Sequence, residues 1–142
     1  MTDEALEEAA NSPNQPSVLI VEDDEDLVLL YQLNVKRWNL PVTYRFASDG
    51  YAALSDMSED PPSFVIADLS MPNIDGFKML DSLSRVGVSI PIVVVTGLAN
   101  YEVKKLGPLA DELIILKKPV DFDFLRKLVM MALGVRPIKD DV

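Results

Sequence analysis

The sequence predicts a doubly wound α/β fold, with helices on both faces of a five-stranded parallel sheet. Short apolar runs alternate along the chain with longer segments in which apolar residues recur at helical spacing. The links between them are short, which is typical of strand–helix repeats in a parallel sheet. Most of the runs are apolar throughout, as expected of strands that are buried on both faces.

The first half of the chain is expected to form two strand–helix units. Ser48 or Asp49 is the expected N-cap of the second helix, because both side chains can accept a hydrogen bond from the first helical turn. The expected elements are a strand at 18–21, a helix at 25–38, a strand at 43–47 and a helix at 51–57. The inward face of the first helix is expected to include Leu27, Leu30, Tyr31 and Trp38.

The second half continues the same alternation. A Pro61-Pro62 pair separates the second helix from the third strand, and Gly134 is expected to end the last helix. Gly107-Pro108 falls where a fourth helix would finish, so that helix is expected to be short. The expected elements are strands at 64–67, 92–95 and 113–116, and helices at 76–85 and 122–133.

The length of 142 residues suits one domain with a packed core. Residues 1–17 hold four acids and no base, and are expected to form a flexible acidic tail. The folded domain is expected at 18–134, followed by a short C-terminal tail at 135–142.

Charge and composition exclude several function classes. A net charge of −10 argues against a nucleic-acid-binding surface and against binding to anionic membranes. The chain has no cysteine and no histidine, which excludes thiolate chemistry, catalytic triads based on histidine, and metal sites that use either residue. With no membrane-spanning stretch and no secretory signal, a cytoplasmic protein is expected.

Polar side chains follow four of the expected strands. Glu22-Asp23-Asp24 follows the first strand, Asp68 the third, Thr96 the fourth, and Lys118 the fifth. Ligands of open parallel sheets bind outside the carboxyl ends of the strands, so we expect these side chains to converge at one edge. Taken alone, the acidic cluster is more typical of a solvated loop that caps a helix. Lys117 is an alternative to Lys118, because adjacent strand residues point to opposite faces.

The chemistry of this residue set favours phosphoryl transfer. Crowded carboxylates repel one another unless a cation neutralises them, and ligands that are all oxygen select a hard cation such as Mg²⁺. Asp68 has no acidic neighbour and follows the central strand, which suits a carboxylate that accepts a phosphoryl group. A lysine and a threonine hydroxyl could then contact the phosphoryl oxygens.

The motifs VLIVEDDEDL, IADLSMPNIDGF, VVVTG and KKP, in this order and spacing, resemble the receiver domain of two-component response regulators. The resemblance covers about residues 18–133 and implies the flavodoxin-like receiver fold. It implies Asp68 as the phosphoacceptor, with Thr96 and Lys118 contacting the phosphoryl group. It also implies a site for Mg²⁺ (or Mn²⁺) formed by Glu22, Asp23, Asp68 and the backbone carbonyl of Ser70.

The resemblance further implies a regulatory domain rather than an enzyme. Its partners would be a sensor histidine kinase or a histidine phosphotransfer protein, and a downstream protein or a second copy bound through the face formed by the fourth helix, fifth strand and fifth helix. On that face we expect apolar residues outside the buried stripe of the last helix, namely Phe124, Met130 and Met131, and from the neighbouring segment Tyr101, Leu106 and Leu109. One departure stands out: Ile115 occupies a position that is aromatic in many receivers. This leaves a pseudo-receiver, a protein-binding module that is never phosphorylated, as the alternative. A phosphatase with an aspartate nucleophile fits less well. Such enzymes resemble D-x-D-x-T at the nucleophile, and here Ser70 stands where that motif has its second acid.

Overall fold

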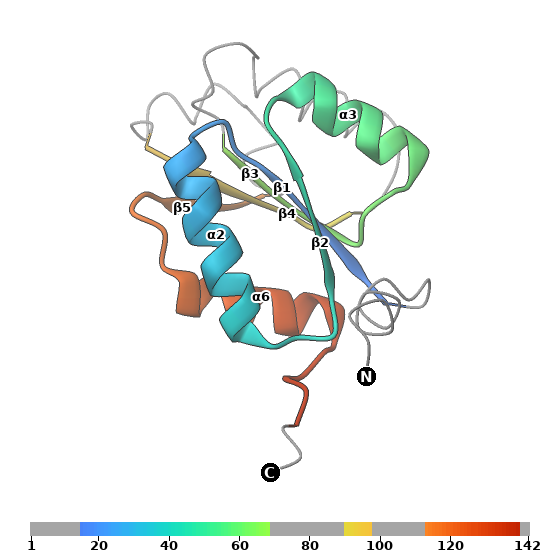
Figure 1. Ribbon diagram of the computed structural model, residues 1–142, viewed down its shortest axis with the longest axis vertical. Helices are drawn as coiled ribbons and strands as arrows, with labels where there is room; N and C mark the ends of the chain where they lie inside the picture. Colours follow the sequence, from blue (N-terminus) through green and yellow to red (C-terminus); the bar gives the residue numbers. More distant parts are fainter. Residues whose placement is uncertain (1–14, 69–89, 98–112, 140–142) are drawn as a thin grey trace.

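The computed structural model describes residues 15–68, 90–97 and 113–139, and these form a parallel sheet with helices on both faces (Figure 1). The helix expected at 76–85, the short fourth helix and most of the expected N-terminal tail lie outside the described residues. The strands are β1 (Ser17–Val21), β2 (Thr43–Ala47), β3 (Phe64–Asp68), β4 (Ile92–Thr96) and β5 (Ile114–Lys117). The described helices are α2 (Glu25–Trp38), α3 (Gly50–Glu59) and α6 (Phe122–Leu133).

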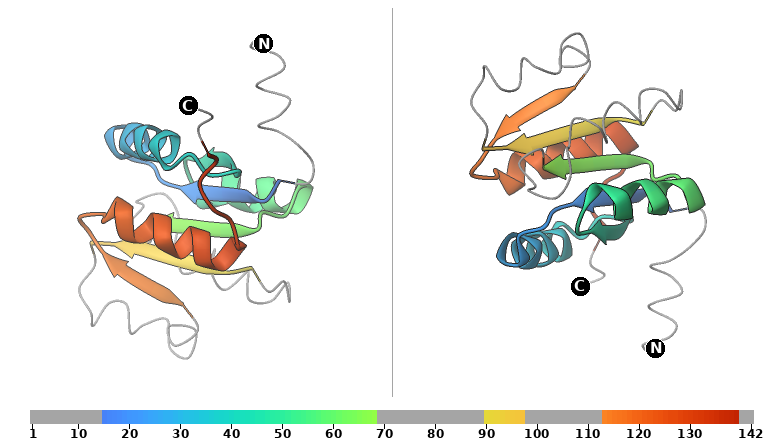
Figure 2. Two further views of the ribbon diagram at one scale, coloured as in Figure 1. Left: turned by 90° about the horizontal axis from the view of Figure 1, so that it is seen from below. Right: turned by 90° about the horizontal axis from the view of Figure 1, so that it is seen from above.

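The strand order is β2-β1-β3-β4-β5, and every neighbouring pair is parallel. Figure 2 shows β1, β3, β4 and β5 following one another across the sheet, with β5 at the edge. The order reverses between β1 and β3, since the chain moves outward to β2 and then returns past β1. In sheets of this kind, the gap at such a reversal is where ligands bind.

Alternate strand residues supply the cores on the two faces of the sheet. Val18 and Ile20 pack with α2 and α6, whereas Leu19 and Val21 pack with α3. This alternation follows from the two-residue period of a strand, and every one of these side chains is fully buried because both faces are covered. The sheet is therefore a rigid support for the loops at its carboxyl end.

The predicted α/β fold is confirmed, and most element boundaries agree closely. The bounds of α2, β2 and α6 are those expected, and Asp49 rather than Ser48 caps α3. Strands β3 and β4 each extend one residue further than expected, and β1 begins one residue earlier. The position of β5 was wrong by one residue at each end, because its pairing with β4 starts at Ile114.

Two side-chain assignments on the helices were wrong. Leu30, expected to face inward, is 47% exposed, whereas Val35, which was not among the residues expected on the inward face, is buried. On α6, Met130 was expected outside the buried stripe, yet it packs against the core from one side. Both errors reflect the 100° step of a helix, which leaves residues at the margin of the apolar stripe undecided until the neighbouring elements are placed.

The described C-terminal residues lie against the end of α2. The Ile138 N–H donates to the Asn39 carbonyl at 2.8 Å, and the Asn39 side-chain amide donates to the Ile138 carbonyl at 2.8 Å. Val135 packs against the core. The segment that follows α6 is thus attached to the domain as far as residue 138.

Candidate functional site

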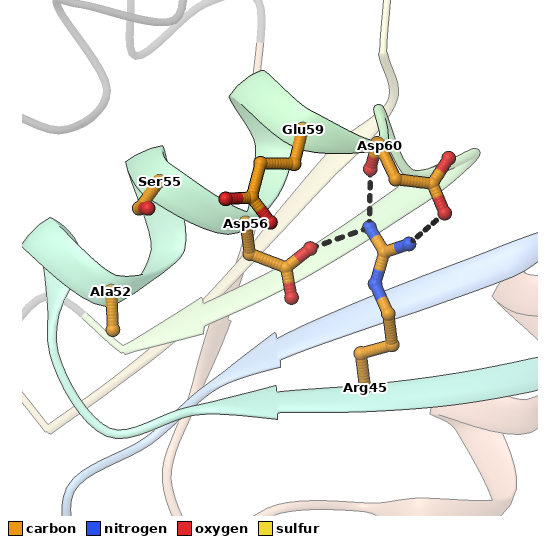
Figure 3. A pocket seen from close by; sticks show the side chains of 6 residues that line it. All are labelled: Arg45, Ala52, Ser55, Asp56, Glu59 and Asp60. Atoms are coloured by element: carbon orange, nitrogen blue, oxygen red, sulfur yellow. Dashed lines mark hydrogen bonds and ion pairs between the residues drawn. The ribbon is translucent and has the colours of Figure 1, made fainter.

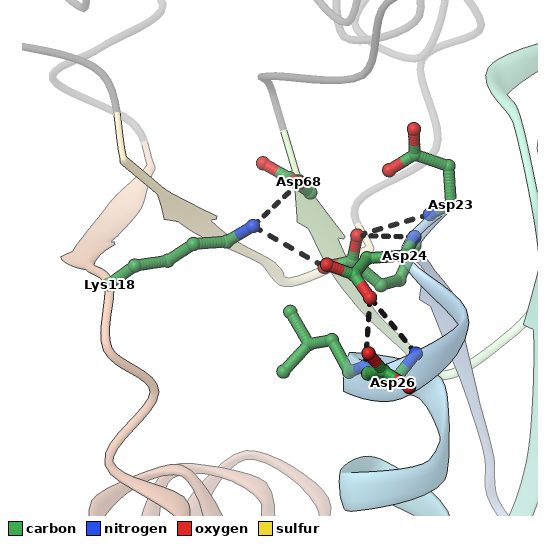
Figure 4. A network of polar contacts seen from close by, with 7 residues as sticks. Asp23, Asp24, Asp26, Asp68 and Lys118 are labelled. Carbon is green, nitrogen blue, oxygen red and sulfur yellow. Dashed lines mark hydrogen bonds and ion pairs between the residues drawn. The ribbon is translucent and has the colours of Figure 1, made fainter.

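Four strand ends place the candidate site at the carboxyl edge of the sheet (Figure 4). Asp68 is the last residue of β3 and Thr96 the last residue of β4, while Glu22 directly follows β1. The register aligns Val21 with Ala67 and Asp68 with Val95, so the ends of these three strands are level. Lys118 follows β5 and reaches toward Asp68 across the strand ends.

Three carboxylates form the centre of the site. Ligand oxygens of Glu22, Asp23 and Asp68 lie within 4.8 Å of one another. Glu22 is 3% exposed and Asp68 4% exposed, whereas Asp23 is open to solvent. Oxygen atoms this close can share one hard cation, and the exposed side of the group leaves room for water or phosphate oxygens.

The environment of Glu22 is specialised. Burial raises its pKa to about 7, and the nearby Asp68 charge adds to the effect. The hydrogen bond from the Asp24 N–H, at 3.2 Å, opposes the shift, as does the charge of Lys118. The Asp23 N–H donates to the same Glu22 oxygen at 3.1 Å. The turn after β1 therefore holds the carboxylate in place while burial and the second acid favour its protonation.

Lys118 supplies the positive charge of the site. Its Nζ lies 2.9 Å from Asp68 Oδ2 and 3.6 Å from Glu22 Oε1. Partial burial lowers the pKa of Lys118, but its hydrogen bond to Asp68 and the two carboxylate charges outweigh this, and the net pKa is raised. The backbone is fixed as well, because the Lys118 N–H donates to the Thr96 carbonyl at 2.9 Å. Lys117 is exposed, so of the two lysines it is Lys118 that reaches the carboxylates.

The third acid of the cluster has a different role. The Asp24 carboxylate caps α2 by accepting from the N–H groups of Asp26, at 2.9 Å, and Leu27, at 3.2 Å. The two interpretations of the acidic cluster thus apply to different residues. Asp24 caps a helix, while Glu22 and Asp23 belong to the site.

The remaining expected residues are placed as follows. Thr96 is fully buried at the end of β4. Ser70 lies outside the described residues. Ile115 is half-buried and packs with the core cluster on the α3 side of the sheet.

Tyr31, expected only as a core residue, is close enough to the site for the charges of Glu22 and Asp68 to act on it. It is 2% exposed on α2, and its ring meets Phe122 edge-on at 5.3 Å. Burial raises the pKa of Tyr31, and the charges of Glu22 and Asp68 add to the rise. The helical spacing of Tyr31 is that of an ordinary core residue, so no sequence signal separates it from Val35 or Trp38.

A second pocket, between β2 and α3, holds an ion-pair cluster (Figure 3). Arg45 on β2 pairs with Asp56 at 2.8 Å and with Asp60 at 2.6 Å, and donates to the Asp60 carbonyl. Ala52, Ser55 and Glu59 complete the lining. These contacts attach the C-terminal end of α3 to an edge strand, which is a structural function.

Comparison with known proteins identifies the class to which this fold and site belong. The Response regulator receiver domain family matches residues 18–130, and the chain belongs to this family. It is a receiver of two-component signalling, in a family that is generally regulatory rather than catalytic. The acidic group is typical of the magnesium site of receivers, and receivers pair with histidine kinases.

Curated relatives include the sensor histidine kinase RcsC of Escherichia coli, 30% identical over 92% of this chain but only 14% of the kinase. The transcriptional regulatory protein ZraR of Salmonella typhimurium is 28% identical, over 82% of this chain and 26% of that protein. The Regulator of RpoS of Escherichia coli is 29% identical, over 82% of this chain and 34% of that protein. The chain thus spans about a third or less of the length of these relatives.

Solved structures show the same fold. The receiver domain of a LuxO repressor protein from Vibrio parahaemolyticus has a TM-score of 0.74 at 25% identity, covering 84% of this chain and 91% of that one. The chemotaxis protein CheY4 of Vibrio cholerae has a TM-score of 0.71 at 22% identity, covering 84% and 99%. Within the described residues of this chain, no helix has the length and apolar character needed to cross a membrane.

Proposed function

We propose that this chain is a phosphoacceptor receiver, which takes a phosphoryl group from a phosphohistidine of a partner onto Asp68. One observation carries the proposal: the buried Asp68 carboxylate lies between the Lys118 ammonium, at 2.9 Å, and the two acids Glu22 and Asp23. A carboxylate that only stabilised the fold would not need two further acids beside it, because crowding like charges is costly.

In the proposed reaction, an Asp68 carboxylate oxygen attacks phosphorus, and an acyl phosphate bond forms. The bond between phosphorus and the donor nitrogen breaks, and the electron pair leaves with the imidazole. Lys118 stays close to the charge that moves from Asp68 to the phosphoryl oxygens, and Thr96 supplies a hydroxyl at the neighbouring strand end. Positioning and charge neutralisation of this kind account for most of the catalysis of phosphoryl transfer.

Glu22, Asp23 and Asp68 are the described residues that would hold Mg²⁺ or Mn²⁺, and Ser70 would add its backbone carbonyl. The ion would neutralise the phosphoryl oxygens during transfer. Because this sequence contains no histidine, the phosphoryl donor lies outside it: a sensor histidine kinase, a histidine phosphotransfer protein or a small phosphodonor.

For the output we propose the face formed by β5 and α6, where Ile114, Phe124 and Met131 are exposed. Tyr101, Leu106 and Leu109, expected to extend this face, lie outside the described residues. A target protein bound there would have to respond to a change at Asp68 through β4 and β5, and β5 is paired with β4 along its whole length.

The proposal is tested by incubating the protein with acetyl phosphate and Mg²⁺ and measuring its intact mass. Wild type should gain the mass of one phosphoryl group, and Asp68→Asn should gain none, because the amide keeps the shape but loses the nucleophilic charge. Asp123→Asn is the matched control, since it makes the same change at an exposed acid that pairs with Arg126 and Lys127 of its own helix. Labelling of Asp68→Asn to the wild-type level would refute the assignment.

The pseudo-receiver remains the second candidate because of Ile115. If wild type takes up no phosphate from acetyl phosphate or from a phosphorylated kinase domain, while a target still binds the β5–α6 face, the chain is a binding module of this kind.

A further inference from the structure

The outer face of α2 is more apolar than a solvated helix requires. Leu29, Leu30 and Leu33 are 57%, 47% and 58% exposed and lie together in the middle of the helix. The opposite face, with Tyr31, Val35 and Trp38, is buried against the sheet. In both views of Figure 2, α2 runs along the outside of the molecule. Three large leucines side by side in water are typical of a surface that a partner covers.

Charged residues lie at both ends of this leucine patch. Glu25 and Asp26 are in the first turn of α2, and Lys36 and Arg37 are in the last. Within the described part of the chain, none of the four forms an ion pair. At 100° per residue, Asp26, Lys36 and Arg37 fall within about 70° of the centre of the leucine patch and Glu25 within about 90°, so all four flank it.

This pattern is self-complementary when the helix is reversed. Each helix would present acidic residues at one end, leucines in the middle and basic residues at the other. If a second helix of the same sequence lies antiparallel across the first, with the two-fold axis near residue 31, acids face bases at both ends. Glu25 then faces Lys36 of the second copy, and Asp26 faces Arg37 of the second copy, because these pairs share both height and lateral position.

We propose that α2 is the interface of an antiparallel homodimer, in which Leu29, Leu30 and Leu33 of two copies pack together and four ion pairs flank them. Such an interface is isologous, as expected of two-fold dimers. The proposal does not depend on phosphorylation of Asp68.

The charges on α6 give a useful contrast. Phe124 and Met131 are also exposed there, but Asp123 already pairs with Arg126 and Lys127 of its own helix, at 3.4 Å each. Because these three charges already pair within one helix, they do not need ion-pair partners from a second copy. The charge pattern therefore selects α2 for self-association and leaves the β5–α6 face for a different partner.

The dimer is expected to be weak. Fourteen residues make a helix about 21 Å long, so the contact falls at the small end of specific interfaces. Since α2 begins three residues after Glu22, the second copy would lie beside the rim of the acidic site.

Sedimentation equilibrium tests the proposal. The protein concentration should run from about 10 μM to about 1 mM, the range in which dimers with small interfaces form. Wild type should show a reversible monomer–dimer equilibrium. Leu33→Gln should weaken it about tenfold or more, because each dimer loses two buried leucines. Met131→Gln is the matched control, since it makes the same chemical change at an exposed site on α6.

Charge reversal gives the sharper test. Glu25→Lys and Lys36→Glu should each weaken association several-fold by placing like charges opposite one another, and the double variant should restore it. Asp123→Lys, which changes the net charge equally, is the control for Glu25→Lys. Circular dichroism confirms that each variant is folded.

Three results would overturn the proposal: a wild type that stays monomeric throughout, association that Met131→Gln abolishes and Leu33→Gln does not, or a double variant that stays as weak as the single ones. If wild type is monomeric and Leu33→Gln instead slows phosphate uptake from a kinase, the leucine patch is the docking surface of the phosphodonor.

Discussion

At Glu22, the free-energy cost of burying a charge opposes the need of the candidate site for a charged carboxylate. The Glu22 carboxylate is buried, and the charge of Asp68 raises its pKa further, yet the Asp24 N–H and Lys118 favour the charged form. A bound divalent ion would compensate for the burial, and protonation does so when no ion is bound. Stability and metal binding should therefore both depend on pH near neutrality.

The pH dependence of the metal-free protein has a definite sign. The pKa of Glu22 rises from 4.5 to about 7 on folding, so the folded state binds this proton more tightly. The resulting stabilisation is complete below about pH 4.5 and is lost as the pH rises through 7. In EDTA, wild type should therefore lose about 2 to 3 kcal/mol of unfolding free energy relative to Glu22→Gln between pH 5 and pH 8. Urea denaturation of both proteins at several pH values measures this, and parallel curves would contradict it.

Magnesium should stabilise the wild-type protein through its three carboxylates. At a free Mg²⁺ concentration 100 times Kd, linkage gives about 2.7 kcal/mol. Asp23→Ala should remove most of this stabilisation, and should also raise the Tm of the metal-free protein by relieving repulsion. Asp123→Ala, which removes an exposed acid from α6, should leave the response to Mg²⁺ unchanged. A wild-type Tm that does not change with Mg²⁺ would argue against the metal site.

At the scale of elements, helix ends position the site. Asp24 caps α2 directly after the two site acids, so the turn that holds Glu22 is fixed by the start of a helix. At the other end of the chain, α6 begins at its cap Asp121, three residues after Lys118, and ends at Gly134. The backbone of Lys118 is thus held between the end of β5 and the start of α6.

The end of α6 offers a test of backbone conformation alone. Gly134 has φ of +64°, and an added Cβ would contact no atom within 4 Å, so the cost of Gly134→Ala is conformational strain, about 1 kcal/mol. Gly97 also has open space around it and no such φ. Gly97→Ala should therefore not lower the urea midpoint, whereas Gly134→Ala should lower it. Equal losses in the two variants would contradict this explanation.

At the scale of the whole molecule, contacts between distant parts of the chain close the domain. Asn39, at the end of α2, exchanges two hydrogen bonds with Ile138, although 99 residues separate them. Asn39 also has a positive φ of 52°, which Asn and Asp tolerate better than other side chains do. This contact joins the C-terminal segment to the same helix that carries the leucine patch.

A double-mutant cycle measures the strength of this contact. Asn39→Asp keeps the size of the side chain but replaces the amide donor with a carboxylate oxygen, so the bond to the Ile138 carbonyl is lost. In the full chain it should cost about 1 kcal/mol more than in a chain truncated after Pro137, where the acceptor is missing. Chemical denaturation of the four proteins gives the coupling, and additive effects would show that the contact contributes nothing.

The sequence alone determined the order of elements, because buried parallel strands need apolar runs and amphipathic helices need a 3.6-residue period. It also predicted a candidate site at Glu22, Asp23, Asp68, Thr96 and Lys118, because these polar residues follow apolar runs. The tertiary structure decided what local patterns leave open. It placed Lys118 rather than Lys117 against Asp68, separated the cap Asp24 from the site acids, and buried Tyr31 within range of the charges of the site. These outcomes depend on which strand ends are level and on where each helix rests on the sheet, and both are set by contacts between residues far apart in the chain.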